Sequence, residues 1–164
     1  MALDTKVKYI HSGMTGAPQI SGSTAGSLLA VLTACLVNGF GSHSVDSIVV
    51  SGGIATVNRA AGHSFEQHQV VKIAGATPSG LNGEKKVLTA TATSYTFDAT
   101  GISDQTASGT ITAKRAPAGF SKAFSGTNKA AYRADDVAST RLYLQVDDSP
   151  AQYPTLTMYE TMSD

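Results

Sequence analysis

The spacing of hydrophobic residues changes from helical to strand-like near residue 46, and this change limits the folds open to the chain. Before it, the stretch SGSTAGSLLAVLTACLVNGFG repeats apolar residues at the spacing of one broad helix face. After it, short runs such as SIVVSGGIATVNR and HQVVKIAGA alternate apolar with polar residues, as strands do. One helix followed by many short strands predicts a mainly β (α+β) protein.

The helix is expected to lie buried against a small sheet. Ser23 or Thr24 can cap its N-terminus by accepting a backbone N–H bond, and Asn38-Gly39 suits a left-handed stop at its other end. The chain has a single cysteine, which excludes an internal disulfide. Because that cysteine lies on the apolar face, we interpret it as a small core residue. The predicted core residues of the helix are Leu28, Leu32 and Cys35.

The segment after the helix predicts a second, strand-rich core. Its strands of four to eight residues lie between Gly, Pro, Asn and Ser clusters, which is typical of a small antiparallel β-barrel or sandwich. A tight turn is expected at Ser51-Gly52-Gly53. The alternation predicts that Val71, Ile73 and Phe97 lie in this core.

These patterns divide the chain into two lobes. Residues 1–45 and 116–164 are expected to form an outer α+β lobe, and residues 46–115 an inserted antiparallel β lobe. The outer lobe would contain strands near residues 7–11, in RLYLQVDD and in TLTMYETM, with a long structured connection between Pro117 and Thr140. Burying the apolar residues of the insert would contribute about 1.5–3 kcal/mol for each large side chain.

The charges are balanced in number but uneven along the chain. Twelve basic and twelve acidic residues give a formal net charge of zero, which argues against a uniform nucleic-acid footprint. Basic residues concentrate between Lys114 and Arg141, and every charge after Arg141 is acidic. Two interpretations are open: the segments are ordinary solvated surface, or a basic patch on one copy meets an acidic patch on the next. The candidate inter-subunit contacts are Lys122, Lys129, Arg133, Arg141, Asp147 and Asp148.

Two polar clusters resemble catalytic or metal sites only superficially. GSHSVD places Ser42, His43 and Asp46 close in sequence, whereas a catalytic triad is assembled from separate elements. GHSFEQH offers His63, Glu66 and His68, but on a strand the three side chains do not converge. Asp98 and Asp104 do not match a calcium loop. We therefore expect no enzyme activity, no cofactor and no metal.

The chain also lacks the sequence signals of a membrane or secreted protein. MALDTKVKYI has no apolar segment of the kind found in signal peptides. The longest apolar run, at about residues 28–37, is too short to cross a bilayer. We expect synthesis in a cytoplasm and no membrane partner.

Several stretches, spread over nearly the whole chain, carry a resemblance to known proteins; among them are VKYIHSGMTGAPQ, AGSLLAVLTACLVNGFG, IAGATPSGLNGEKKV, TFDATGISDQTASGTITAKRAPAGF, KAFSGTNKAAYR and RLYLQVDD. These stretches resemble a family of small structural proteins encoded among the late, virion-assembly genes of tailed bacteriophages. Residues 63–112 also resemble a small β module of phage tail and fibre proteins. The family implies no catalytic residues.

The resemblance implies a non-enzymatic structural component of a virion, multimeric and placed at the tail, neck or baseplate. Its partners would be copies of itself and other virion structural proteins. An alternative is a capsid decoration or head-fibre base protein. A further alternative is a host-surface or glycan-binding β module, which the absence of tryptophan and the 7% aromatic content disfavour.

Overall fold

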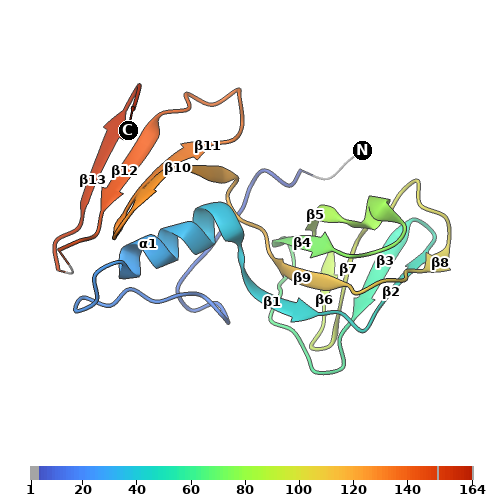
Figure 1. Cartoon of the computed structure of the whole chain (residues 1–164). Coiled ribbons are helices and arrows are strands. Elements are labelled where there is room, and N and C mark those ends of the chain that lie inside the picture. The colour runs from blue at the N-terminus through green and yellow to red at the C-terminus, as the bar shows by residue number, and fades with distance from the viewer. Residues whose placement is uncertain (1–3, 151, 164) are drawn as a thin grey trace. The chain divides into compact units, whose positions relative to one another are not determined.

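The structure is a computed structural model that describes residues 4–150 and 152–163. It is mainly β with one helical segment, as the sequence predicts (Figure 1). The chain divides into two compact units, which we describe separately. The β unit contains Phe40–Ala116 together with Met14–Gly16 and the N-terminal stretch up to Ile10. The helix unit contains His11–Gly13, Ala17–Gly39 and Pro117–Asp164.

The β unit extends beyond the predicted insert of residues 46–115 at its N-terminal side. Phe40–Ser44, which the sequence analysis assigned to the outer lobe, forms strand β1 and pairs antiparallel with β9, so that Phe40 lies opposite Arg115. The N-terminal residues also belong to this unit, because Lys8 forms a 2.9 Å ion pair with Glu84. The strand predicted at residues 7–11 is absent, since this segment forms no strand pairing.

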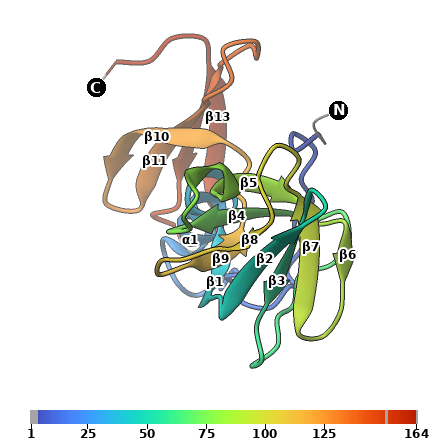
Figure 2. The same ribbon diagram turned by 90° about the vertical axis from the view of Figure 1, so that its right-hand side faces the viewer.

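Two antiparallel sheets make up the β unit (Figure 2). The first has the order β1-β9-β4-β5, comprising β1 (Phe40–Ser44), β9 (Thr112–Arg115), β4 (Val70–Ala74) and β5 (Gly83–Lys86). The second has the order β6-β7-β3-β2-β8, comprising β6 (Thr89–Ala90), β7 (Ser94–Asp98), β3 (Ile54–Asn58), β2 (Ser47–Ser51) and β8 (Gln105–Thr106). A short 3₁₀ turn, η2 (Ser79–Leu81), precedes β5.

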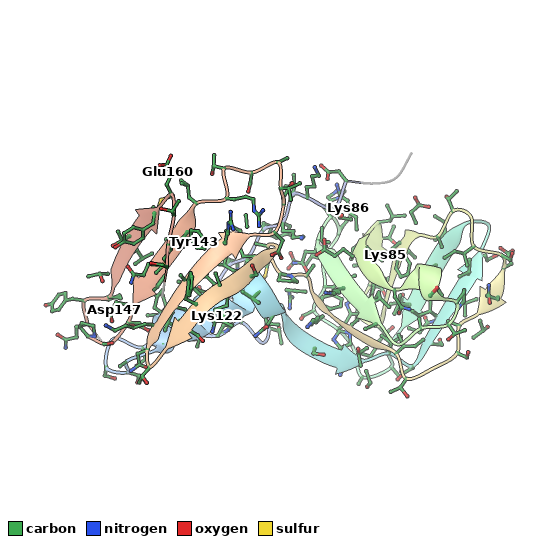
Figure 3. The ribbon with its side chains drawn as sticks, turned by 45° about the horizontal axis from the view of Figure 1, so that its top comes forward. Lys85, Lys86, Lys122, Tyr143, Asp147 and Glu160 are labelled. Carbon is green, nitrogen blue, oxygen red and sulfur yellow. The ribbon has the colours of Figure 1, made fainter. Side chains whose placement is uncertain are left out.

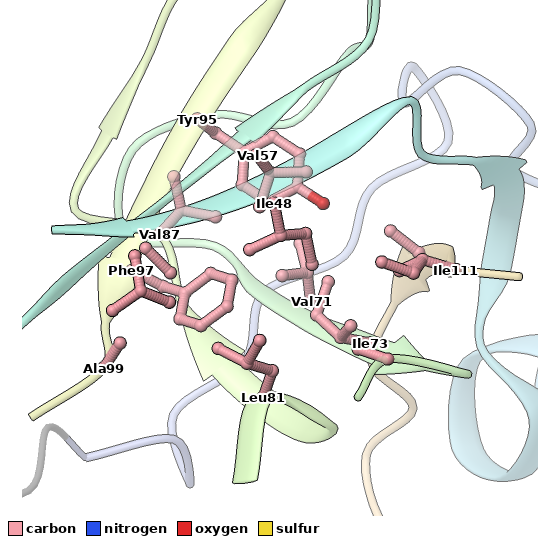
Figure 4. Close-up of a cluster of buried hydrophobic side chains, with 14 of the residues drawn as sticks. Ile48, Val57, Val71, Ile73, Leu81, Val87, Tyr95, Phe97, Ala99 and Ile111 are labelled. Carbon is pink, nitrogen blue, oxygen red and sulfur yellow. The ribbon is translucent and has the colours of Figure 1, made fainter. Parts of the chain in front are cut away.

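Apolar side chains from both sheets meet in one core (Figure 4). Val71 and Ile73 enter it from β4, and Phe97 enters from β7; all three are fully buried, in agreement with the alternation in the sequence. Ile48, Val57 and Tyr95 fill the same core from the second sheet. The contribution of both sheets to a single core gives the unit the architecture of a small β-sandwich.

The turn predicted at Ser51-Gly52-Gly53 joins β2 to β3. Ser51 lies opposite Ile54, and the two glycines between them have φ values of 56° and 77°. Two consecutive residues with positive φ match the twist of a two-residue hairpin, and glycine adopts this conformation without steric cost.

The helix unit combines one helical segment with a four-stranded antiparallel meander. The sheet has the order β10-β11-β12-β13, comprising β10 (Phe120–Gly126), β11 (Lys129–Ala134), β12 (Tyr143–Asp147) and β13 (Thr155–Tyr159). The helix α1 (Ser27–Leu32) continues into the wider π-helical segment η1 (Thr33–Asn38), and the Gly39 N–H donates to the Ala34 carbonyl at 2.8 Å. Gly39 then ends the segment at the predicted position, but with φ 72° and ψ 173° it does not adopt the predicted left-handed helical conformation.

The helix is less buried than its sequence suggests. Leu28, Leu32 and Cys35 are each only partly buried, although Leu28 and Leu32 pack against the buried residues Tyr132 and Val146 of the sheet. The expectation of full burial was wrong for these residues. Among the described residues of this unit, a single layer of sheet contacts one side of the helix, and a broad apolar face cannot be enclosed by one layer.

The segment after Pro117 forms a hairpin where the sequence suggested a connection. β10 and β11 pair from Phe120↔Ala134 to Gly126↔Lys129. Asn128 in their tight turn has φ 55°, a conformation that Asn tolerates better than most residues. Because Ala, Ser and Gly fill these strands, their hydrophobic alternation is too weak to predict them. The two later strands, β12 and β13, lie where the sequence predicts them.

Candidate functional site

Asp148 caps the helix from inside its unit and is therefore not an inter-subunit contact. Its side chain is 1% exposed, and its carboxylate accepts the backbone N–H groups of Leu28 at 2.8 Å and Leu29 at 3.3 Å. The Asp148 backbone is fixed as well, because its carbonyl accepts the Gly26 N–H. The predicted caps at Ser23 and Thr24 are wrong, since the carboxylate arrives from the end of β12.

The other predicted contacts are largely engaged within the same sheet. Lys129 and Asp147 lie opposite each other on β11 and β12 and form a 2.7 Å ion pair. The hydrogen bond from Lys129 is the largest of the causes that lower the pKa of Asp147 to about 2, and hydrogen bonds from Ser149 add to it. Because both charges are neutralised across one strand pair, they do not form the free patches expected from the sequence.

The Arg133 side chain is also engaged within the unit. The Arg133 guanidinium donates to the Arg141 carbonyl and to the Tyr143 hydroxyl, each at 3.1 Å, and lies over the Tyr143 ring. Among the described residues, neither Lys122 nor Arg141 makes an ion pair. Arg141 is partly buried, whereas Lys122 is exposed and its ammonium lies 5.9 Å from the centre of the Tyr132 ring. Of the six predicted contacts, Lys122 remains the most available for a partner.

The outer edge strand β13 is the first candidate functional site. All five of its residues are exposed, and Leu156 and Met158 are 53% and 64% exposed. They lie opposite Val146 and Leu144 of β12, so they continue the apolar face that packs against the helix. Beyond the helix, this face is open. β13 therefore presents both an unpaired strand edge and exposed apolar side chains.

The two edges of this sheet differ in how they are protected. β10 carries Lys122, and its register with β11 shifts between Lys122 and Phe124, as in a β-bulge. A lysine and a bulge are common means of preventing a strand edge from pairing. β13 has neither, since its sequence TLTMY is uncharged and its register with β12 is continuous. Figure 3 shows Lys122 on β10 and Glu160 beyond the end of β13.

The polar clusters considered in the sequence do not form a catalytic triad or a metal site. Ser42 and His43 follow one another on β1, and the Asp46 carboxylate accepts the Ala60 N–H at 2.6 Å. Within residues 4–150 and 152–163, no group of three His, Cys, Asp or Glu side chains is placed to hold a metal ion.

A pocket in the β unit is the second candidate site. It has a volume of about 530 Å³ and is lined by Thr15, Gly16, Gly41, Ser42, His43, Arg59, Ala61, Gly62, His63 and Ser64. His43 comes from β1, while Arg59 and His63 come from the loop after β3. Both imidazole rings lie close to the buried Phe65 ring, with centroid distances of 4.9 and 5.8 Å. The fold thus brings two histidines of separate elements to one pocket.

Arg115 lies behind the wall of this pocket. It is 4% exposed, and its guanidinium donates to the Thr15 carbonyl at 3.0 Å and to the Ser64 carbonyl at 2.6 Å. Its cationic carbon lies 5.3 Å from the Phe65 ring centre. Glycine suits position 41, because its φ is 67° and a Cβ there would lie 3.0 Å from the Arg115 Nη1 atom.

The sequence shows His43 and His63 but does not indicate that they lie close together. GSHSVD by itself suggests a triad and GHSFEQH by itself suggests a metal motif. Nothing in the spacing of His43 and His63 indicates that they share a pocket, because this depends on the β1–β9 pairing and on the loop after β3. Arg115 in ITAKRAPAG is the other residue that could have pointed to the pocket. In the sequence it is simply one more charge of the basic segment.

No known family model matches the chain, and a search of curated proteins found no match. Within the part of the chain that the structure describes, no helix is both long enough and apolar enough to cross a membrane.

Proposed function

We propose that this protein is a non-enzymatic structural component of a tailed-phage virion, placed at the tail, neck or baseplate, and that it associates with copies of itself. Two independent observations support the proposal. One is the resemblance of nearly the whole chain to small late-gene structural proteins. The other, which carries the argument for association, is the open edge strand β13.

The exposure of β13 fits a contact surface better than a free surface. An uncharged edge strand with a regular register is a ready template for pairing with another strand. Leu156 and Met158 would lose exposed apolar area on association, and each buried apolar Å² stabilises by about 25 cal/mol. Natural monomers usually prevent such an edge from pairing, as Lys122 and the irregular register do for β10.

The partner that best fits this edge is β13 of a second copy. Antiparallel pairing centred on Thr157 would set Leu156 of each copy opposite Met158 of the other and keep all four side chains on one face. No like charges would meet within the paired strands, because TLTMY has none. A two-fold contact of this kind is the commonest symmetry of soluble oligomers. This contact replaces the charge-based contact expected from the sequence.

Sedimentation velocity over a range of protein concentrations tests this association. The wild-type chain should dimerise, and Met158→Lys should raise the dimer dissociation constant by roughly tenfold or more, because it places a charge on the paired apolar face. Val137→Lys is the matched control. Val137 is 80% exposed and lies between β11 and β12, so the same change there should leave dimerisation unaltered.

A wild-type chain that stays monomeric at every concentration would contradict self-association through β13. Equal effects of Met158→Lys and Val137→Lys would contradict the choice of strand. Self-association that requires Lys122 instead would identify β10 as the contacting edge.

Cryo-electron microscopy of particles that contain this chain tests the virion role separately. We expect density for the chain at the tail, neck or baseplate, with β13 paired to a strand of a neighbouring subunit. Density on the head would support the alternative of a capsid decoration or head-fibre base protein. Absence of the chain from purified particles would contradict the virion role.

A further inference from the structure

The proposed structural role does not involve the pocket lined by His43, Arg59 and His63. Its volume of about 530 Å³ falls within the range of small-molecule sites, which is about 300–1,000 Å³. Its lining combines hydroxyl groups from threonine and serine with glycine backbone and cationic or protonatable side chains. None of the lining residues is acidic.

The charges around His43 are all of one sign. Burial is the largest cause that lowers the pKa of His43, and a hydrogen bond to the Gly41 carbonyl opposes it. Arg59, His63 and Arg115 act on the ring through their charge, and each of them disfavours its protonation. Groups of positive charge that face one another without an anion repel, so an anionic ligand would stabilise the arrangement.

Arg115 adds a buried charge without an ion pair. Burial is the largest cause that lowers the pKa of this guanidinium, while the charges of Glu66 and Tyr9 raise it. Among the described residues its hydrogen bonds go to Thr15 and Ser64, which supply carbonyl and hydroxyl oxygens and no carboxylate. A buried charge with only neutral partners is costly, and an anion in the adjoining pocket would reduce that cost.

The two imidazoles offer complementary hydrogen-bonding atoms. The Nδ1 atom of His63 accepts the Phe65 N–H at 3.1 Å, so the neutral ring carries its proton on Nε2. The Nδ1 atom of His43 donates to the Gly41 carbonyl at 3.2 Å, so its Nε2 donates only when the ring is protonated. Both Nε2 atoms are buried and have no partner among the described residues. Buried polar atoms of folded proteins are paired with protein, water or ligand, so these two Nε2 atoms are free to bind a ligand that displaces water.

We propose that this pocket binds the phosphate or carboxylate group of a small molecule, with Arg59 and His63 as its donors. The Arg59 guanidinium already donates to the Gly62 carbonyl at the pocket wall, which leaves further N–H groups for an oxyanion. The nearby serine and threonine hydroxyls can contact the remainder of the ligand. An anion beside His43 would favour the protonated ring, which then donates a third hydrogen bond.

NMR of the full chain tests this site without knowledge of the natural ligand. The ring signals of His43 and His63 would be followed during titration with glucose 6-phosphate, glucuronate and glucose. We expect saturable shifts of both rings with at least one of the two anionic sugars and none with glucose. His11 and His68 are exposed and do not line the pocket, so their signals serve as internal controls. Tighter binding of glucose 6-phosphate indicates a phosphate ligand, and tighter binding of glucuronate indicates a carboxylate ligand.

Arg59→Gln removes the pocket charge and retains a donor for the Gly62 carbonyl. It should weaken binding roughly tenfold, the scale of one lost charge-assisted hydrogen bond. Lys72→Gln is the matched control, because Lys72 is exposed on β4 and makes the same change of charge outside the pocket. Arg59→Lys, which keeps the charge, should bind more tightly than Arg59→Gln.

Three results would overturn the proposal. The first is the absence of saturable shifts with either anionic sugar up to about 10 mM, a concentration that detects even millimolar sites. The second is equal binding of glucose. The third is equal weakening by Arg59→Gln and Lys72→Gln. The sugar comparison on the wild-type chain decides the question even if Arg59→Gln does not fold, and dimerisation through β13 is tested by separate variants.

Discussion

The two units differ in how completely they enclose their apolar residues. The β unit places a fully buried cluster between two sheets, which includes fifteen of its described residues. In the helix unit the corresponding cluster has three fully buried residues, Ala130, Tyr132 and Val146, surrounded by partly buried leucines of the helix. One unit has two layers that cover each other, while the other has one sheet covered along part of one face.

The difference indicates where each unit obtains its stability. Close-packed burial between layers is the main stabilising contribution to a small domain, so apolar contacts among its own residues stabilise the β unit. The helix unit depends more on specific polar contacts, such as the buried carboxylate of Asp148 at the helix N-terminus. Its open strand β13 leaves apolar surface that a partner can cover.

The largest predicted effect is a difference between two core truncations. Phe97→Ala in the β unit should lower the free energy of unfolding by about 3–5 kcal/mol, because Phe97 is fully buried. Leu32→Ala in the helix unit should cost about 1–2 kcal/mol, because Leu32 is only partly buried. Differential scanning calorimetry of the two variants measures both. An equal or larger loss for Leu32→Ala would mean that the helix unit is as well enclosed as the β unit.

A smaller effect is expected from removing the helix cap. Asp148→Ala leaves the Leu28 and Leu29 N–H groups without their acceptor and should destabilise the helix unit by about 1–2 kcal/mol. Asp135→Ala, at an exposed aspartate outside the helix, is the control. Circular dichroism during thermal unfolding reports the change. If the two variants melted alike, the buried carboxylate would not support the helix.

The smallest effect is a dependence on pH that arises from the Lys129–Asp147 pair. The pKa of Asp147 is lowered to about 2 in the folded chain, from 3.8 without these contacts. A lowered folded pKa means that the stabilisation is complete above the unfolded value and is lost as the pH falls from about 4 to about 2. Asp147→Asn should remove this part of the pH dependence, whereas Asp135→Asn should keep it. Thermal melts from pH 5 to pH 2 would show it, and identical profiles for the two variants would refute it.

The sequence predicts the β unit better than the helix unit, for a physical reason. Phe97 lies between the polar residues Thr96 and Asp98, and Val71 and Ile73 lie on either side of the exposed Lys72, so the sequence indicates which face of each strand is buried. β10 and β11 are built largely from Ala, Ser, Gly and Lys, so their alternation is weak and the hairpin was missed. β1 was missed because its partner β9 lies about seventy residues later in the chain.

The candidate sites were less predictable than the fold. The positions of Lys129 and Asp147 in the sequence suggested opposite surface patches, but strand pairing sets them face to face within one sheet. Asp148 follows Asp147 directly, yet the alternation of side chains along a strand sends it to the buried side. The pocket of His43 and His63 depends on contacts between distant segments, which spacing along the chain does not reveal.

Hydrogen exchange of the full chain, followed by mass spectrometry at several protein concentrations, tests the contrast between the units most directly. The core strands β3, β4 and β7 should be the slowest to exchange, at the same rate at every concentration. The amides of β13 should exchange fast in dilute solution and become protected as the concentration rises. Protection of β13 that is independent of concentration, or exchange of both units in one cooperative step, would contradict the account.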